Sequence, residues 1–199
     1  YKSMIKFHTS GGLAAVWAPE NTREAIFDAL ARRETYAASG PRMAVGFYAG
    51  WGIDDAIMQD RNPFQSLIAN AVPMGSVLRL PANPDAVKQN SPGFMVWATR
   101  DPMDAPLQRV QIIKGWIDAE GQTQEKVVDI ACADGLTVDP ATGRCPDNGA
   151  TVDLASCNFS TDSGANELKT LWHDPDYDPG QSAFYYARVL MNPTCRWSS

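Results

Sequence analysis

The chain has 199 residues, of which 44% are hydrophobic and 20% charged, and its formal net charge is -6 at pH 7. This composition excludes a largely disordered chain, and the scattered Lys and Arg argue against a nucleic-acid partner, because phosphate binding needs clustered basic side chains. No apolar run approaches the roughly 18 to 20 residues of a membrane span, so we expect one globular domain, or one domain and a piece of another.

The first predicted element is a short apolar strand over residues 13–17, which lies between a pair of glycines and a proline. The run has no helical period, so it predicts a strand that is buried on both faces. Asn21 and Glu24 then have the spacing of a capping box, in which each side chain bonds to the backbone N–H of the other residue. An amphipathic helix over 22–33 is expected to follow, and a Gly-Pro turn ends this unit.

Short elements are expected in the next part of the chain. Alternation over 43–48 predicts a strand, and 53–58 predicts one or two helical turns. Asn62 precedes a proline that suits the first helical position, so it is expected to cap a helix over 63–70. A short strand is expected over 77–80.

A β-rich region follows. Turn formers at 118–121 predict that the strands on either side of them form a hairpin. Residues 167–172 form either a brief helix or a brief strand. Asp178, followed by Phe-Tyr-Tyr, is typical of the corner in immunoglobulin-like sandwiches where a Tyr hydroxyl bonds back to the loop. Strands are expected over 94–99, 107–114, 124–130 and 184–190.

Four cysteines, Cys132, Cys145, Cys157 and Cys195, all lie in the last third of the chain. They have no C-x-x-C spacing and only two histidines could join them, so disulfides are favoured over a zinc site or free buried thiols. Of the three possible pairings, we expect Cys132 with Cys145, because a turn-rich loop can bring them together, and Cys157 with Cys195. Disulfides indicate an oxidising compartment, so the chain is predicted to be periplasmic or secreted.

Four aspartates in this turn-rich region have two interpretations. They could be calcium ligands, but their spacing matches no EF-hand loop, and Asp before Gly or Pro is typical of Asx turns. With two histidines and scattered carboxylates, no catalytic metal cluster is expected within the chain itself. The aspartates are Asp134, Asp139, Asp147 and Asp153.

The stretch ENTREAIFDALARRETYAASGPR, residues 20–42, with the apolar strand before it, resembles the closing β-α unit of the PHP-like (polymerase and histidinol phosphatase) metallohydrolases, in particular a bacterial branch known only as a domain of unknown function. Together with the strand pattern and the Tyr corner, the resemblance predicts an α+β, mostly β fold. Residues 1–40 would be the last strand and helix of a PHP-like barrel, and 41–199 an immunoglobulin-like β-sandwich with loop insertions and cysteine-containing loops. The resemblance continues through residues 72–75, 106–116, 174–179, 183–189 and 193–197.

Members of that family use divalent metal ions to activate water for hydrolysis, typically of a phosphate ester. The family's H-x-H and D-x-H motifs are absent from this chain, which opens with Tyr1 rather than Met. The resemblance therefore implies a C-terminal fragment of a metal-dependent hydrolase, inactive alone and without a cofactor of its own. Its partner would be the upstream part of the same polypeptide, which would hold the metal ions and the catalytic residues.

The resemblance also implies a substrate rim. If residues 13–17 are the last barrel strand, its C-terminal end directs Trp17, Glu20 and Asn21 toward the mouth, where such barrels keep their chemistry. Glu20 could equally be a solvated carboxylate near a helix N-terminus. Arg42 is a candidate anion contact, or an ordinary charge at a strand edge.

A stand-alone β-sandwich that binds carbohydrate or protein is the alternative. Trp51, Trp116, Tyr177 and Trp197 could form a flat binding surface, although tryptophans in a sandwich more often belong to the core. The segment 1–40 favours the hydrolase, because a capped helix after a doubly buried strand closes a barrel and has no purpose in a simple sandwich.

Overall fold

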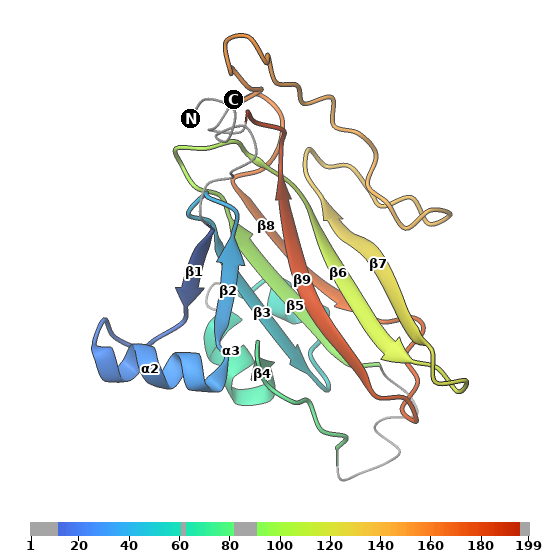
Figure 1. Cartoon of the computed structure of the whole chain (residues 1–199). Coiled ribbons are helices and arrows are strands. Elements are labelled where there is room, and N and C mark those ends of the chain that lie inside the picture. The colour runs from blue at the N-terminus through green and yellow to red at the C-terminus, as the bar shows by residue number, and fades with distance from the viewer. Residues whose placement is uncertain (1–11, 61–62, 82–90, 196–199) are drawn as a thin grey trace.

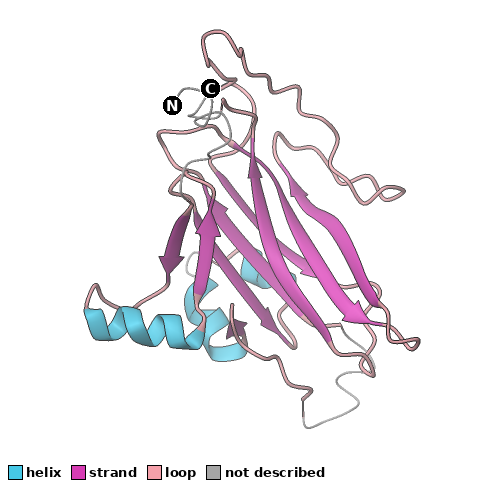
Figure 2. Cartoon of the chain, viewed as in Figure 1, coloured by secondary structure: helices cyan, strands magenta, loops and turns pink. Residues whose placement is uncertain are grey.

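The computed structural model describes residues 12–60, 63–81 and 91–195, and it is mostly β, with two short α-helices and three antiparallel sheets (Figures 1 and 2). Two of the sheets pack face to face as a sandwich. The first sheet contains, in spatial order, β4 (Val72–Pro73), β3 (Ala44–Gly50), β5 (Gly93–Thr99) and β8 (Glu167–His173). The second contains β7 (Thr123–Cys132), β6 (Leu107–Ile117) and β9 (Ala183–Met191).

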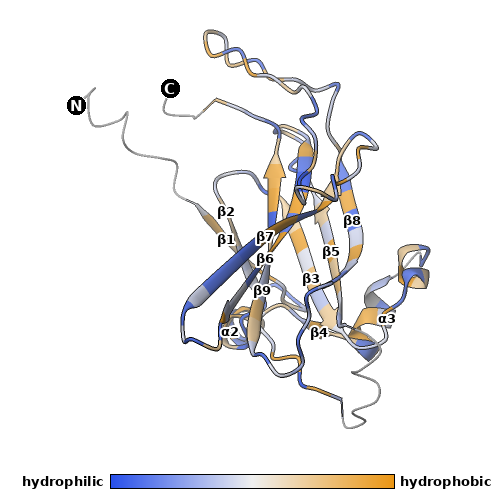
Figure 3. Ribbon diagram, turned by 90° about the vertical axis from the view of Figure 1, so that its right-hand side faces the viewer, coloured by the Kyte–Doolittle hydropathy of each residue, from blue (hydrophilic) through white to orange (hydrophobic). Residues whose placement is uncertain are grey.

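The core lies between these sheets. Val96 and Ala98 of β5 meet Leu107 and Val110 of β6, and the side chains of all four are fully buried. Alternation places such residues on the inner face of each strand, where each fully buried aliphatic side chain contributes roughly 1.5 to 3 kcal/mol. In Figure 3, β7 is hydrophilic in its first half, which agrees with the exposure of its first four residues.

The predicted strands of the sandwich are confirmed within a few residues, and 167–172 is strand rather than helix. The immunoglobulin-like strand order is wrong. In an immunoglobulin sandwich the third strand lies in the sheet opposite the first, whereas here β5, the third sandwich strand, pairs with β3, the first. The near-continuous apolar run of β5 suits a central strand, and this strand lies between β3 and β8 rather than at an edge.

The N-terminal ribbon, which we define as β1 (Leu13–Val16), α2 (Arg23–Arg32) and β2 (Thr35–Ala38), lies beside the sandwich (Figure 1). β1 pairs antiparallel with β2, which the sequence did not predict as a strand. The expected doubly buried strand is wrong, because Leu13 is 40% exposed. A PHP-like barrel strand would need parallel neighbours, and no barrel closure is present in the described residues.

The helix in this ribbon begins one residue later than expected. Thr22, not Asn21, is the N-cap, and its Oγ1 accepts from the Ala25 backbone N–H at 3.3 Å. Thr22 has the extended backbone that a cap requires, with φ of -117°. Of the helix residues, only Ala29 is buried.

A second layer covers the outer face of the first sheet. Ile57 of the 3-10 turn η1 (Asp55–Met58) and Leu67 of α3 (Pro63–Asn70) pack on Met95. Both helical predictions are confirmed, while the proposed cap Asn62 lies outside the described residues. The strand expected over 77–80 is wrong, because those residues are irregular and pairing is confined to the two residues of β4.

The disulfide prediction is confirmed in full: Cys132 pairs with Cys145 and Cys157 with Cys195. Asp139, Asp147 and Asp153 each accept from the backbone N–H two residues later, so they form the expected Asx turns. In residues 12–60, 63–81 and 91–195, no group of three His, Cys, Asp or Glu side chains could hold a metal ion. Neither helix in these ranges has the length and apolar character needed to cross a bilayer.

Candidate functional site

The four predicted rim residues do not gather at one mouth. Trp17 donates its indole N–H to the carbonyl of Val45 at 2.8 Å, so it faces the sandwich. Glu20 Oε1 accepts from the Thr22 hydroxyl beside the helix N-terminus, and Asn21 is exposed. Arg42 is exposed and gives its backbone N–H to Asp101 Oδ2 at 2.8 Å. Their contact with a substrate stays a prediction.

The carbonyls along one edge of β3 show how the ribbon is attached to the sandwich. The Tyr36 hydroxyl donates to the carbonyl of Met43 at 3.0 Å, and Trp17 bonds to Val45 two residues further on. The carbonyl of Phe47, two residues after Val45, accepts from the backbone N–H of Met74 at 2.8 Å. The ribbon side chains therefore occupy the part of this edge that the two-residue strand β4 leaves unpaired.

A groove of about 540 Å³ lies between β2, β3 and β9. This volume is in the range of pockets that hold small ligands. Its lining is mainly apolar and includes one charged residue, Arg188. The lining residues are Thr35, Tyr36, Ala37, Ala38, Ser39, Met43, Val45, Phe47, Met74, Tyr186, Ala187, Arg188, Val189 and Leu190.

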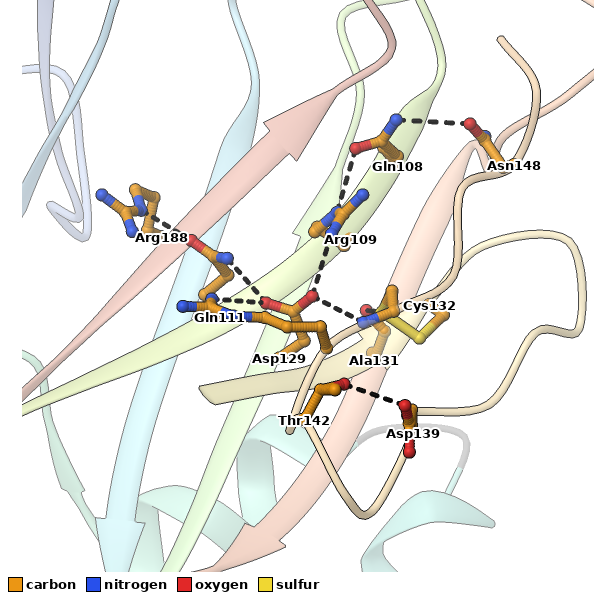
Figure 4. Close-up of polar contacts among 12 residues, drawn as sticks. Gln108, Arg109, Gln111, Asp129, Ala131, Cys132, Asp139, Thr142, Asn148 and Arg188 are labelled. Carbon is orange, nitrogen blue, oxygen red and sulfur yellow. Dashed lines mark hydrogen bonds and ion pairs between the residues drawn. A yellow bond between two sulfur atoms is a disulfide. The ribbon is translucent and has the colours of Figure 1, made fainter. Parts of the chain in front are cut away.

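Arg188 is held by a hydrogen-bonded chain that crosses the outer face of the second sheet (Figure 4). Its Nε donates to Gln111 Oε1 at 2.8 Å, and Gln111 Nε2 donates to Asp129 Oδ1 at 2.6 Å. The Asp129 carboxylate is fully buried and also accepts from the Cys145 backbone N–H at 2.7 Å. Arg109 Nη1 donates to the same carboxylate at 3.0 Å. The strand register places Gln111 of β6 opposite both Asp129 of β7 and Arg188 of β9, so the three hydrogen-bonded side chains lie in one row across three adjacent strands.

The electrostatics of this network favour an ionised Asp129. Burial by itself raises the pKa of a carboxyl group, but hydrogen bonds from the Cys145 N–H, Gln111 and Arg109 outweigh it. The pKa of Asp129 is therefore lowered below its usual value. The Cys132–Cys145 disulfide fixes the loop that brings the Cys145 N–H to this carboxylate.

Positive charge exceeds negative charge in this network. The Asp129 carboxylate accepts hydrogen bonds from Arg109 and, at 3.4 Å, from Arg144. Arg188 is linked to the same carboxylate through Gln111. Within the part of the chain that the structure describes, the terminal guanidinium nitrogens of Arg188 have no protein acceptor. Arg188 is exposed and lines the groove, so its free N–H groups can bind an anion there.

A second buried network closes the far end of the sandwich. Lys114 Nζ donates to Asp174 Oδ2 at 2.6 Å, and the Tyr185 hydroxyl donates to the same oxygen at 2.7 Å. Burial, followed by this bond to Asp174, raises the pKa of Tyr185. The predicted bond from a Tyr hydroxyl back to the loop is confirmed. The tight packing of this network indicates a structural role.

The four aromatics proposed as a flat binding surface do not share one plane. Trp51 and Tyr177 meet edge to face, with ring centroids 5.7 Å apart, and the Trp51 indole N–H donates to the carbonyl of Arg79. Trp116 lies in the other sheet, with Lys114 Nζ 5.3 Å from its ring centroid. Trp197 lies outside the described residues.

Sequence reasoning missed the residues that form the two networks. Gln111, Lys114 and Asp129 each stand next to apolar residues in β6 or β7, and Arg188 is the one charged residue of β9. A charged residue within a buried strand must be paired, because an isolated buried charge costs several kcal/mol. That signal was present, but choosing the partners required the strand register.

Comparisons with known proteins give a family but no activity. The family model described as "Protein of unknown function (DUF3604)" matches residues 1–199. Among curated proteins, a ferrochelatase from Acidobacterium capsulatum is 32% identical over 81 residues, which cover 37% of this chain. The match covers 24% of that protein's own length. No solved structure matches the chain.

Proposed function

Because the chain belongs to the DUF3604 family, we propose that it is the C-terminal accessory part of a metal-dependent hydrolase of the phosphoesterase type. The upstream part of the same polypeptide would supply the metal ligands. The bound ions would lower the pKa of a water molecule and neutralise charge in the transition state. This chain would contribute a stable sandwich and the rim candidates Glu20, Asn21 and Arg42.

The observation that carries the proposal is the bare apolar surface of the N-terminal ribbon. Phe27 is 68% exposed and Leu30 50% exposed on α2, and Leu13 of β1 is 40% exposed. A ten-residue helix with one buried residue is marginal on its own, because isolated helices shorter than ~12 to 15 residues are barely stable. We infer that another part of the polypeptide covers this surface.

The cell compartment forms part of the proposal. The two disulfides favour an oxidising compartment. We infer a periplasmic or secreted location for the parent protein.

The test compares this chain with a longer polypeptide that includes the segment encoded before Tyr1. Bound divalent metal is measured by elemental analysis, and hydrolysis is assayed with 4-nitrophenyl phosphate and bis(4-nitrophenyl) phosphate. We expect metal and hydrolysis in the longer polypeptide and neither in the 199-residue chain. Tightly bound metal in the 199-residue chain, or none in the longer one, would contradict the proposal.

A matched pair of variants tests the covered surface separately. Phe27→Asp should lower the thermal stability of the longer polypeptide but have little effect on the 199-residue chain, where Phe27 is already exposed. Leu154→Asp is the control, because Leu154 is 77% exposed in a loop outside the ribbon. Equal effects of Phe27→Asp in the two polypeptides would show that nothing covers the helix.

A further inference from the structure

The sandwich is closed along its centre and open along one side. Val96 and Val110, at the centre, have no exposed surface. Val45 of β3 and Val189 of β9 are only half-buried, although they belong to strands of the same two sheets. Residues of β3 and of β9, which belong to opposite sheets, line the groove together with β2 of the N-terminal ribbon.

An open strand edge borders the groove on the β9 side. The backbone N–H of Asn192 donates to the carbonyl of Pro106, on the side of β6. Because successive residues of a strand bond to opposite sides, the N–H and C=O groups of Val189 and Ala187 point away from β6. β9 pairs with β6 alone in the described residues, so these groups face the open edge.

β2 has a similar edge. The Trp17 backbone N–H donates to the carbonyl of Glu34, so the same alternation directs Thr35 and Ala37 away from β1. Consecutive residues of β2 and of β9 line the groove, as expected when strand edges rather than strand faces form its walls. The apolar side chains of Met43, Val45 and Phe47 lie between these two edges.

We propose that this groove binds an extended peptide segment that pairs with β9 and places an acidic side chain beside Arg188. An added strand satisfies open N–H and C=O groups along its length, which is the basis of β-strand addition. In such a strand, the residue opposite Arg188 lies on the same outer face as the guanidinium. Its two neighbours face the apolar core, so the recognised pattern is apolar, acidic, apolar.

Arg188 is prepared for this role by the network behind it. Its Nε is held by Gln111, and Gln111 is held by Asp129, while the terminal N–H groups remain available on the exposed side. Asp129 and Gln111 are positioning residues for this guanidinium. The proposal concerns a different surface from the exposed helix, and it does not depend on a hydrolase function.

The test measures binding of a fluorescent, end-capped peptide, Val-Thr-Val-Glu-Val-Thr-Val, to the full chain by anisotropy. Matched peptides carry Gln or Lys in place of Glu. We expect saturable binding at or below ~1 mM for the Glu peptide, with the Gln peptide roughly threefold to fivefold weaker and the Lys peptide weaker still. No saturable binding, or equal affinity for the Glu and Lys peptides, overturns the proposal.

Two variants separate the backbone contribution from the charge. Val189→Pro removes an N–H that faces the open edge and leaves the bonds to β6 in place, so it should weaken every peptide at least tenfold. Arg188→Gln should abolish the difference between the Glu and Gln peptides, and Arg23→Gln, on the exposed helix, is its control. If Val189→Pro does not fold, the Arg188→Gln result decides alone. An unchanged preference for Glu in that variant contradicts the proposal.

Two other occupants would also overturn it. Sedimentation showing that the chain dimerises, with Val189→Pro producing a monomer, would assign the groove to a second copy. Binding of decanoate that depends on Arg188, without peptide binding, would assign it to a small anionic amphiphile.

Discussion

The centre of the sandwich and the N-terminal ribbon contain similar apolar runs, yet they differ in what covers them. Residues 94–98 of β5 lie between two neighbouring strands and beneath a second sheet, and Val96 has no exposed surface. Residues 13–16 of β1 pair with one short strand, and Leu13 remains 40% exposed. An apolar run therefore predicts a strand, but it does not predict that the strand is buried.

The two regions also differ in how they are fastened. The sandwich has two disulfides and two buried ion pairs, and its strands bond to one another along their length. The side chains of Trp17 and Tyr36 join the ribbon to the carbonyls of Val45 in β3 and of Met43 just before it. We therefore expect the sandwich to set the global stability and the ribbon to open by itself.

The largest expected effect comes from the buried network of Lys114, Asp174 and Tyr185. Asp174→Ala would leave Lys114 and Tyr185 buried without their shared acceptor, and losing one partner of a buried pair costs about 3 to 5 kcal/mol. Urea denaturation measures this loss. Asp178→Ala, in the exposed part of the same loop, is the control and should hardly shift the midpoint. Equal shifts for the two variants would mean that the network does not stabilise the sandwich.

The disulfides come next. In the chain-entropy model, the Cys157–Cys195 bond closes a separation of 38 residues and contributes about 4 kcal/mol. The Cys132–Cys145 bond closes 13 residues and contributes about 3 kcal/mol. Replacing each pair with Ser and comparing denaturation midpoints measures the difference. A larger loss from the shorter loop would point to the role of that loop in holding Asp129.

Asp129→Asn should cost about 2 kcal/mol near neutral pH, because charge-assisted hydrogen bonds are replaced by neutral ones. The pKa of Asp129 is lowered in the folded state, so its ionised form stabilises the fold above the unfolded pKa of about 3.9. That stabilisation is lost as the pH falls through the lower, folded pKa. The gap in free energy of unfolding between wild type and Asp129→Asn should therefore shrink below about pH 4. A gap that widens on acidification would contradict this.

The smallest effect concerns the helix cap. Thr22→Ala should destabilise the helix by about 1 kcal/mol, because the Ala25 N–H loses its acceptor. Asn21→Ala should have little effect, since Asn21 lies outside the cap. Because the helix belongs to the ribbon, the change should appear in local amide exchange of α2 and leave the global denaturation midpoint unaltered. The opposite ranking of the two variants would restore Asn21 as the cap.

Alternation and turn formers in the sequence were enough to predict most of the sandwich strands. β6 and β9 were found because apolar residues recur along them between Gly, Pro and Asp turns. β2 was missed because Thr-Tyr-Ala-Ala has no alternation, and its strand character depends on pairing with β1. The strand order was also beyond prediction, since it depends on which strand edges pair across long loops.

The candidate site was less predictable than the fold. Trp17 was predicted to face a barrel mouth, but its indole N–H bonds to a carbonyl of β3, a contact that no local pattern specifies. Arg188 looked like an ordinary strand residue until register placed it opposite Gln111. The cysteine pairing was predictable because loop closure is a local property of the spacing.

Hydrogen exchange measured segment by segment compares the two regions most directly. We expect amides of β5 and β6 to exchange only through global unfolding, while those of β1 and β2 exchange through a local opening of lower free energy. Trp17→Phe, which removes the bond to Val45, should speed exchange in β1 and β2 roughly fivefold, corresponding to about 1 kcal/mol, and leave β5 and β6 unchanged. Equal protection in the two regions, or a Trp17→Phe effect that spreads to β5 and β6, would show that the ribbon and the sandwich are one cooperative unit.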